Sequence, residues 1–238
     1  MGLLNTILGR TKPVQSNLDS LFALPSASIS LQSAAGMSCS GHAGVCFKPP
    51  TGQGFEDMQA EVVKLLAMDG TGGFRKAEDN YGYHWLVVDN ADIEELVTQI
   101  HMVNSSLADS GWGPQLLCSV FGLASLPDPA ATPALEPGGA DSGPGLGDPA
   151  SVLGDPASGL DLQPDAMPEA TAGPGRVLPS SAYLVYLFKR GTFYPFVPEG
   201  KERRNLEEEL KLKSLVAGDL TVEADLDRWF PLWDLPVG

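Results

Sequence analysis

The chain has 238 residues and a formal net charge of −15, with 30 acidic against 15 basic residues. Such a charge repels phosphate backbones and anionic lipid headgroups, which argues against general nucleic-acid binding and leaves at most peripheral membrane contact through a local basic patch. The chain has no apolar run of about 18 residues, no secretory-signal pattern at its start, and only three cysteines, so we expect a cytoplasmic protein with free thiols.

The first predicted elements are helices. Apolar residues recur at spacings of three and four over residues 3–24, which predicts two short helices, the second ended by Pro25. Residues 45–47 predict a short strand, and an apolar stripe predicts a helix over about 55–68.

The middle of the chain predicts two strands and a long helix. The strands, over residues 74–78 and 83–89, are joined by an Asp-Asn-Tyr-Gly turn. Asn90 or Asp92 then caps a helix whose apolar residues keep a helical period up to Gly111.

The last part of the chain predicts a strand over residues 116–123, a β-hairpin over 183–196 and a helix over about 202–216. Aromatic and β-branched residues flank Lys189-Arg190-Gly191 in the hairpin, so its tip is cationic.

Residues 126–180 form an insert that interrupts this pattern. The insert is rich in proline, glycine and aspartate, and it has no aromatic residue between Leu126 and Pro179. Such a composition buries too little apolar surface to offset the entropy of ordering, so we expect disorder here. Residues 1–125 and 181–238 are therefore predicted to form one domain together.

The element order predicts an α+β fold, an antiparallel sheet with helices mainly on one face. A secretion-chaperone-like order fits the pattern. A ferredoxin-like order is the alternative if the Val45 strand joins the centre of the sheet.

Two groups of residues are candidates for a site. Cys39, His42, Cys46 and Cys118 could supply four zinc ligands, but Cys46 and Cys118 lie in apolar runs where buried thiols simply pack. We therefore predict no metal and no cofactor.

The second group is cationic. It comprises Lys189, Arg190 and Tyr194 on the hairpin, with Arg203 and Arg204 at the start of the last helix. These residues either form one surface that binds an acidic partner, or they are ordinary solvent-exposed residues at the ends of the hairpin and the helix, with Arg190 paired to a nearby carboxylate.

Three segments carry a resemblance to a known family. They are residues 189–196 (KRGTFYPF), residues 103–107 with 113–117 (VNSSL and GPQLL), and residues 225–233 (DLDRWFPLW). Together with the opening residues 1–4 and 21–26, they resemble PspAB, the PspA-associated protein of actinobacteria, whose relatives join the strands at 126–180 by a shorter connection.

This resemblance implies a role beside PspA, the membrane-remodelling coiled-coil protein of the phage-shock envelope-stress response, or beside a membrane zinc metalloprotease. It brings no catalytic residues, and the sequence has no convincing acid/base pair or nucleotide loop. We therefore expect a non-enzymatic adaptor. The alternative is an enzyme or small-ligand-binding domain that uses a cleft near Tyr81, Lys189, Arg190 and Tyr194.

Overall fold

The computed structural model describes residues 17–48, 60, 64, 73–126, 181–200 and 202–237. The helix predicted from residue 3, most of the helix predicted over 55–68 and nearly all of the insert lie outside the described residues. No helix of the described residues is long and apolar enough to cross a membrane.

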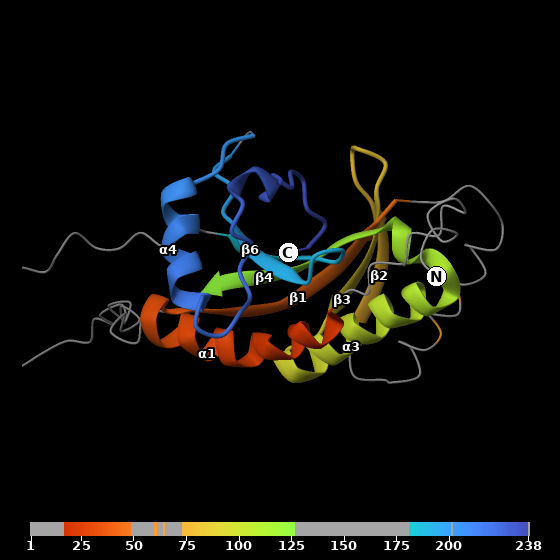
Figure 1. The fold of residues 1–238 in the computed structure, drawn as a ribbon, viewed down its shortest axis with the longest axis horizontal. Coiled ribbons are helices and arrows are strands. Elements are labelled where there is room, and N and C mark those ends of the chain that lie inside the picture. Colours follow the sequence, from red (N-terminus) through yellow and green to blue (C-terminus); the bar gives the residue numbers. More distant parts are fainter. Residues whose placement is uncertain are drawn as a thin grey trace, which may run out of the picture. The chain divides into compact units, whose positions relative to one another are not determined.

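The described residues form a six-stranded antiparallel sheet, which confirms the predicted α+β class (Figure 1). Its spatial order is β2-β3-β1-β4-β5-β6. The strands are β1 (Met37–Phe47), β2 (Gly73–Glu78), β3 (His84–Asp89), β4 (Leu116–Ser125), β5 (Ala182–Leu187) and β6 (Thr192–Phe196). The strand that contains Val45 is thus central, which is the condition given above for the ferredoxin-like order, and β5 and β6 extend the sheet beyond β4.

The helices α1 (Leu24–Ala35), α3 (Ile93–Leu107) and α4 (Leu206–Val216) contribute to one buried cluster on a single face of the sheet. Asp92 is the cap of α3, because its carboxylate accepts from the amides of Glu94 and Glu95 at 2.8 and 3.1 Å. Of the two predicted caps, the structure therefore uses Asp92.

The predicted helix end at Pro25 is wrong. A 3-10 helix over Leu18–Ala23 leads directly into α1, and Pro25 lies in the first turn of α1. Proline is tolerated there because the first-turn amides have no partner within the helix. The helix ends at Gly36, whose φ of 62° is a left-handed conformation that glycine adopts without strain.

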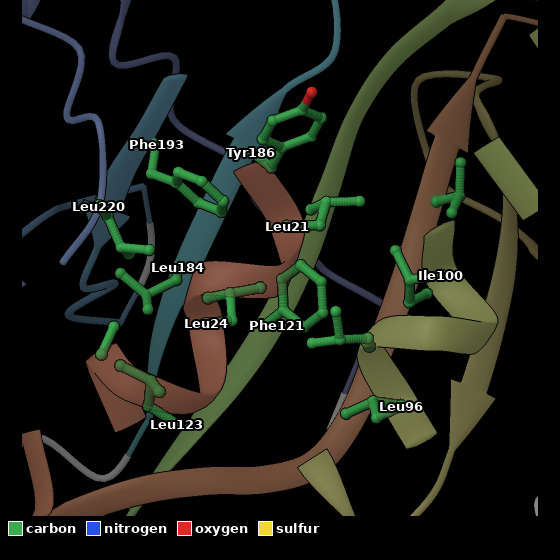
Figure 2. Close-up of a cluster of buried hydrophobic side chains, with 14 of the residues drawn as sticks. Leu21, Leu24, Leu96, Ile100, Phe121, Leu123, Leu184, Tyr186, Phe193 and Leu220 are labelled. Carbon is green, nitrogen blue, oxygen red and sulfur yellow. The ribbon is translucent and has the colours of Figure 1, made fainter. Parts of the chain in front are cut away.

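The main core lies between this helical layer and the sheet (Figure 2). Leu21 and Leu24 from the N-terminal helices face Phe121 of β4, while Leu96 and Ile100 of α3 pack beside them. Leu220, which follows α4, joins Leu184 and Phe193 at the other end of the same cluster, so one core connects both halves of the chain.

The opposite face of the sheet is covered by residues 226–237, which have little regular structure (Figure 1, dark blue). Trp229 is buried and stacks on Tyr194 of β6, with 5.8 Å between ring centroids. Farther along, Asn80 donates to Asp234 at 2.9 Å, and Arg75 of β2 donates to the carbonyl of Pro236. The C-terminal segment therefore runs from the β6 side of the sheet to the β2 side.

Candidate functional site

A pocket of about 740 Å³ lies on the face of the sheet that the C-terminal segment covers. Its floor consists of side chains from five strands: Trp85, Cys46, Cys118, Leu187 and Tyr194. These residues share one face because strand side chains alternate and the strands pair in register, with Cys46 opposite both Trp85 and Cys118. The floor is therefore rigid and mostly apolar.

Three segments form the walls of the pocket: the turn between β2 and β3, the tip of the β5–β6 hairpin, and the stretch from Arg228 to Trp233. Three aromatic residues of these walls remain exposed, namely Tyr81 (57%), Phe230 (57%) and Tyr83 (37%). Large apolar side chains gathered around a hollow are typical of a binding surface.

Asp79 is the one carboxylate among the described residues of the pocket lining, and both of its oxygens accept hydrogen bonds. One carboxylate oxygen accepts from the amides of Tyr81 and Tyr83, each at 2.9 Å, and the other accepts from the Trp85 indole at 2.9 Å. These bonds fix the turn against the sheet, so Asp79 has a structural role in the pocket wall.

Three cations lie in the pocket lining: Lys189, Arg190 and Arg228. Arg190 forms an ion pair with the buried Glu223 through Nε and Nη2, and Arg228 pairs with Asp225 at 2.8 Å. The exposed Lys189 has no ion-pair partner among the described residues. Of these three cations, Lys189 is therefore the one whose charge no described carboxylate neutralises.

Tyr194 and Cys46 are kept neutral. Burial raises the pKa of the Tyr194 phenol, whose hydroxyl donates to the carbonyl of Phe230 at 2.8 Å. A hydrogen bond with Cys118, together with burial, raises the pKa of the Cys46 thiol. These two groups thus add no negative charge at neutral pH.

A second hollow, of about 830 Å³, lies on the other side of Leu232 and Trp233. Among the residues that the structure describes, its charged lining residues are Glu202 and Asp234. Lys201, between two of the lining residues, lies outside the described residues.

The residues predicted from the sequence divide into two sets. Tyr81, Lys189, Arg190 and Tyr194, named for the alternative cleft, all line the first pocket. Arg203 and Arg204 do not line it. Arg204 instead holds the fully buried Glu209 through three contacts of 2.6 to 3.1 Å, and the same carboxylate accepts from the Val197 amide.

Several lining residues were missed by the sequence reasoning: Tyr83, Trp85, Arg228, Phe230 and Trp233. Alternation in Tyr83-His84-Trp85 and the aromatic content of 229–233 were visible signals. Their convergence depends on where the C-terminal segment crosses the sheet, which no local pattern indicates.

The cysteines do not converge with His42. Cys39 packs against the helical core, whereas Cys46 and Cys118 belong to the cluster on the opposite face. His42 lies 2.7 Å from the Asp89 carboxylate. Among the described residues, no group of three or more His, Cys, Asp or Glu side chains could hold a metal ion.

A family model described as PspAB, PspA associated protein B, matches residues 1–132 and 176–237. The match thus includes every strand of the sheet and all residues of the pocket. No curated protein and no solved structure matches the chain.

Proposed function

Because the chain belongs to the PspA associated protein B family, we propose that it is a non-enzymatic cytoplasmic adaptor that binds PspA. The family match agrees with the resemblance carried by the hairpin and the C-terminal motif. The family's description is the reason to name PspA as the partner, and a membrane metalloprotease is the alternative partner.

The observation that carries the adaptor proposal is the exposed aromatic rim of the pocket. Tyr81, Tyr83 and Phe230 keep large apolar surfaces in solvent beside the unpaired charge of Lys189. Aromatic residues are enriched at the centres of protein interfaces, and a cationic rim speeds association with an acidic partner. We take this rim as the docking surface.

The chemistry of the pocket supports a binding role rather than catalysis. Of the described residues, no histidine lines the pocket, and its carboxylate is held by three hydrogen bonds. The nearby thiol and phenol have raised pKa values, whereas a nucleophile needs a lowered one.

The test measures association of the purified protein with PspA from the same host at two ionic strengths. Tyr81→Ala and Phe230→Ala remove exposed rings, so each should weaken binding on the order of tenfold without unfolding the protein. Lys189→Glu should slow association on the order of threefold at low salt and reduce the salt dependence.

Lys211→Glu is the matched control, because it makes the same charge change on the exposed surface of α4. It should leave association unchanged. Binding of PspA that none of the rim variants affects would reject the rim as the docking surface. If PspA does not bind at all but the metalloprotease does, the adaptor has the alternative partner.

The second candidate function is a small-ligand-binding domain or an enzyme. One observation favours it: Tyr81, from a distant part of the sequence, lines the same pocket as Lys189, Arg190 and Tyr194 of the hairpin. The volume of this pocket is within the range of about 300–1,000 Å³ that small-molecule sites have.

A further inference from the structure

The pocket extends from exposed side chains at its rim to buried side chains of the sheet. Its floor is formed by sheet side chains that are almost completely buried, including Trp85, Cys46 and Tyr194. Two hydrogen bonds hold its walls in place: Asn80 donates to Asp234, and Tyr194 donates to the carbonyl of Phe230. A hollow closed by side chains of three segments is preformed for an occupant of small-molecule size.

The lining divides into an apolar part and a cationic part. Trp85, Leu117, Leu187 and Trp233 offer apolar contact to a ligand body. Lys189 and Arg190, from the hairpin tip, supply the charge.

The cations are still able to bind an anion. Arg190 uses Nε and Nη2 for Glu223, so its Nη1 remains as a donor, and the guanidinium is held in place by the pair. Lys189 has an ammonium group that no described carboxylate neutralises. A bound anion would therefore meet one fixed donor and one mobile cation on the same side of the pocket.

One carboxylate lies in the described lining of the pocket, that of Asp79, and both of its oxygens accept hydrogen bonds from the turn and from Trp85. Arg190 and Arg228 are each paired with a carboxylate. Lys189 is therefore the described group of the lining that attracts an anion, and it lies beside Arg190 at the hairpin tip.

We propose that this pocket binds a small amphipathic anion, an acyl or aryl molecule with a single carboxylate or phosphate group, independently of any protein partner. The apolar body lies on the floor against Trp85 and Leu187, and the anionic group lies at the hairpin tip near Lys189 and Arg190. This assigns a ligand site to the chain in addition to the proposed adaptor function.

The test uses the purified full chain and two pairs of probes. Decanoate and decanol form the acyl pair, and 2-naphthoate and 2-naphthalenemethanol form the aryl pair. Calorimetry gives the stoichiometry, and tryptophan emission reports occupancy because Trp85 and Trp233 line the pocket. We expect one site per chain for at least one acid, with the matched alcohol weaker on the order of tenfold.

Variants locate the site. Lys189→Glu should weaken binding of the acid on the order of tenfold and leave binding of the alcohol nearly unchanged. Leu117→Trp should block both by filling the pocket, and if this variant does not fold, Tyr81→Ala tests the wall at an exposed position. Lys211→Glu on α4 is again the charge-matched control and should bind as the wild type does.

Three results would overturn the proposal: no saturable binding of either acid, equal affinity for acid and alcohol, or binding that Lys189→Glu and the pocket variants leave unchanged. If PspA binds and neither acid does, the small-ligand proposal fails while the adaptor proposal stands. Because the probes are titrated without PspA, the two outcomes are distinguishable.

Discussion

At the scale of single residues, two of the three arginines expected in a cationic surface are parts of the fold. Arg190 pairs with Glu223, whose side chain is 3% exposed, and Arg204 pairs with Glu209, whose side chain is fully buried. An ion pair of Arg190 with a nearby carboxylate was one of the two interpretations of the sequence. The sequence could not identify the partner, because Glu223 lies 33 residues farther along the chain. Buried carboxylates of this kind need their cations, since an unpaired buried charge is costly.

We predict that Arg190→Ala lowers the free energy of unfolding by about 2 kcal/mol at neutral pH. Burial acts to raise the pKa of Glu223, but hydrogen bonds from Arg190, the Asp225 amide and Thr192 outweigh it and hold the pKa below its usual 4.5. The interactions of the Glu223 carboxylate therefore stabilise the fold fully above about pH 4.5. This stabilisation is lost as the pH falls through the lower pKa that Glu223 has in the folded protein.

Urea unfolding of wild type and Arg190→Ala from pH 7 down to pH 3 measures this effect. The stability difference between the two proteins should narrow as the pH falls, because Glu223 becomes neutral and no longer needs the guanidinium. Lys189→Ala, at the neighbouring exposed position, is the control and should unfold as the wild type does at every pH. A difference that stays constant down to pH 3 would show that charge pairing is not its cause.

At the scale of elements, strands with alternating or aromatic residues could be predicted from the sequence, but β1 only in part. The prediction covered residues 45–47, whereas β1 runs over Met37–Phe47. Its first eight residues, Met-Ser-Cys-Ser-Gly-His-Ala-Gly, lack the β-branched and aromatic side chains that mark a strand. Pairing holds them in the sheet: residues 37–39 pair with β4 alone, and residues 42–44 pair with β3, which is tertiary context.

Trp229 is the buried aromatic anchor of the C-terminal segment, and we predict that Trp229→Ala costs about 3 to 5 kcal/mol of stability. Trp229 stacks on Tyr194 and donates its indole N–H to the Glu223 carbonyl at 3.1 Å. Because hydrogen bonds from Asn80 and Arg75 hold the far end of the segment, loss of the ring should loosen the part around Trp229. Hydrogen exchange by mass spectrometry would detect this as faster exchange of the backbone amides in that part of the segment.

Phe230→Ala is the matched control, since it removes a neighbouring aromatic ring that is mostly exposed. It should change the unfolding free energy by no more than about 0.5 kcal/mol. Similar losses for Trp229→Ala and Phe230→Ala would mean that the segment is held by something other than burial of the Trp229 ring.

At the scale of the whole molecule, the pocket could be predicted in part. Turn and hairpin chemistry made Tyr81, Lys189, Arg190 and Tyr194 stand out, and all four line the pocket. The floor could not be predicted, because Cys46, Trp85 and Cys118 look like ordinary apolar strand residues until the order β2-β3-β1-β4-β5-β6 places them side by side.

The connection between β4 and β5 leads to the last prediction, that residues 128–178 contribute nothing to folding. The family model leaves residues 133–175 unmatched. Leu123 of β4 pairs directly with Ala182 of β5, so the chain leaves and re-enters the sheet at adjacent points. A six-residue Gly-Ser loop in place of 128–178 can therefore join the strands. It shortens the whole connection over 126–181 about fivefold, a little over two halvings, which should stabilise the protein by about 1.4 kcal/mol.

Thermal unfolding of two variants separates the effect of length from that of sequence. The short loop should raise the midpoint by a few degrees, because closing a shorter loop costs less entropy. A Gly-Ser segment of the same length as residues 128–178 is the control and should unfold at the wild-type temperature. If this control loses many degrees or becomes insoluble, the natural sequence of the insert packs on the domain and is part of its core.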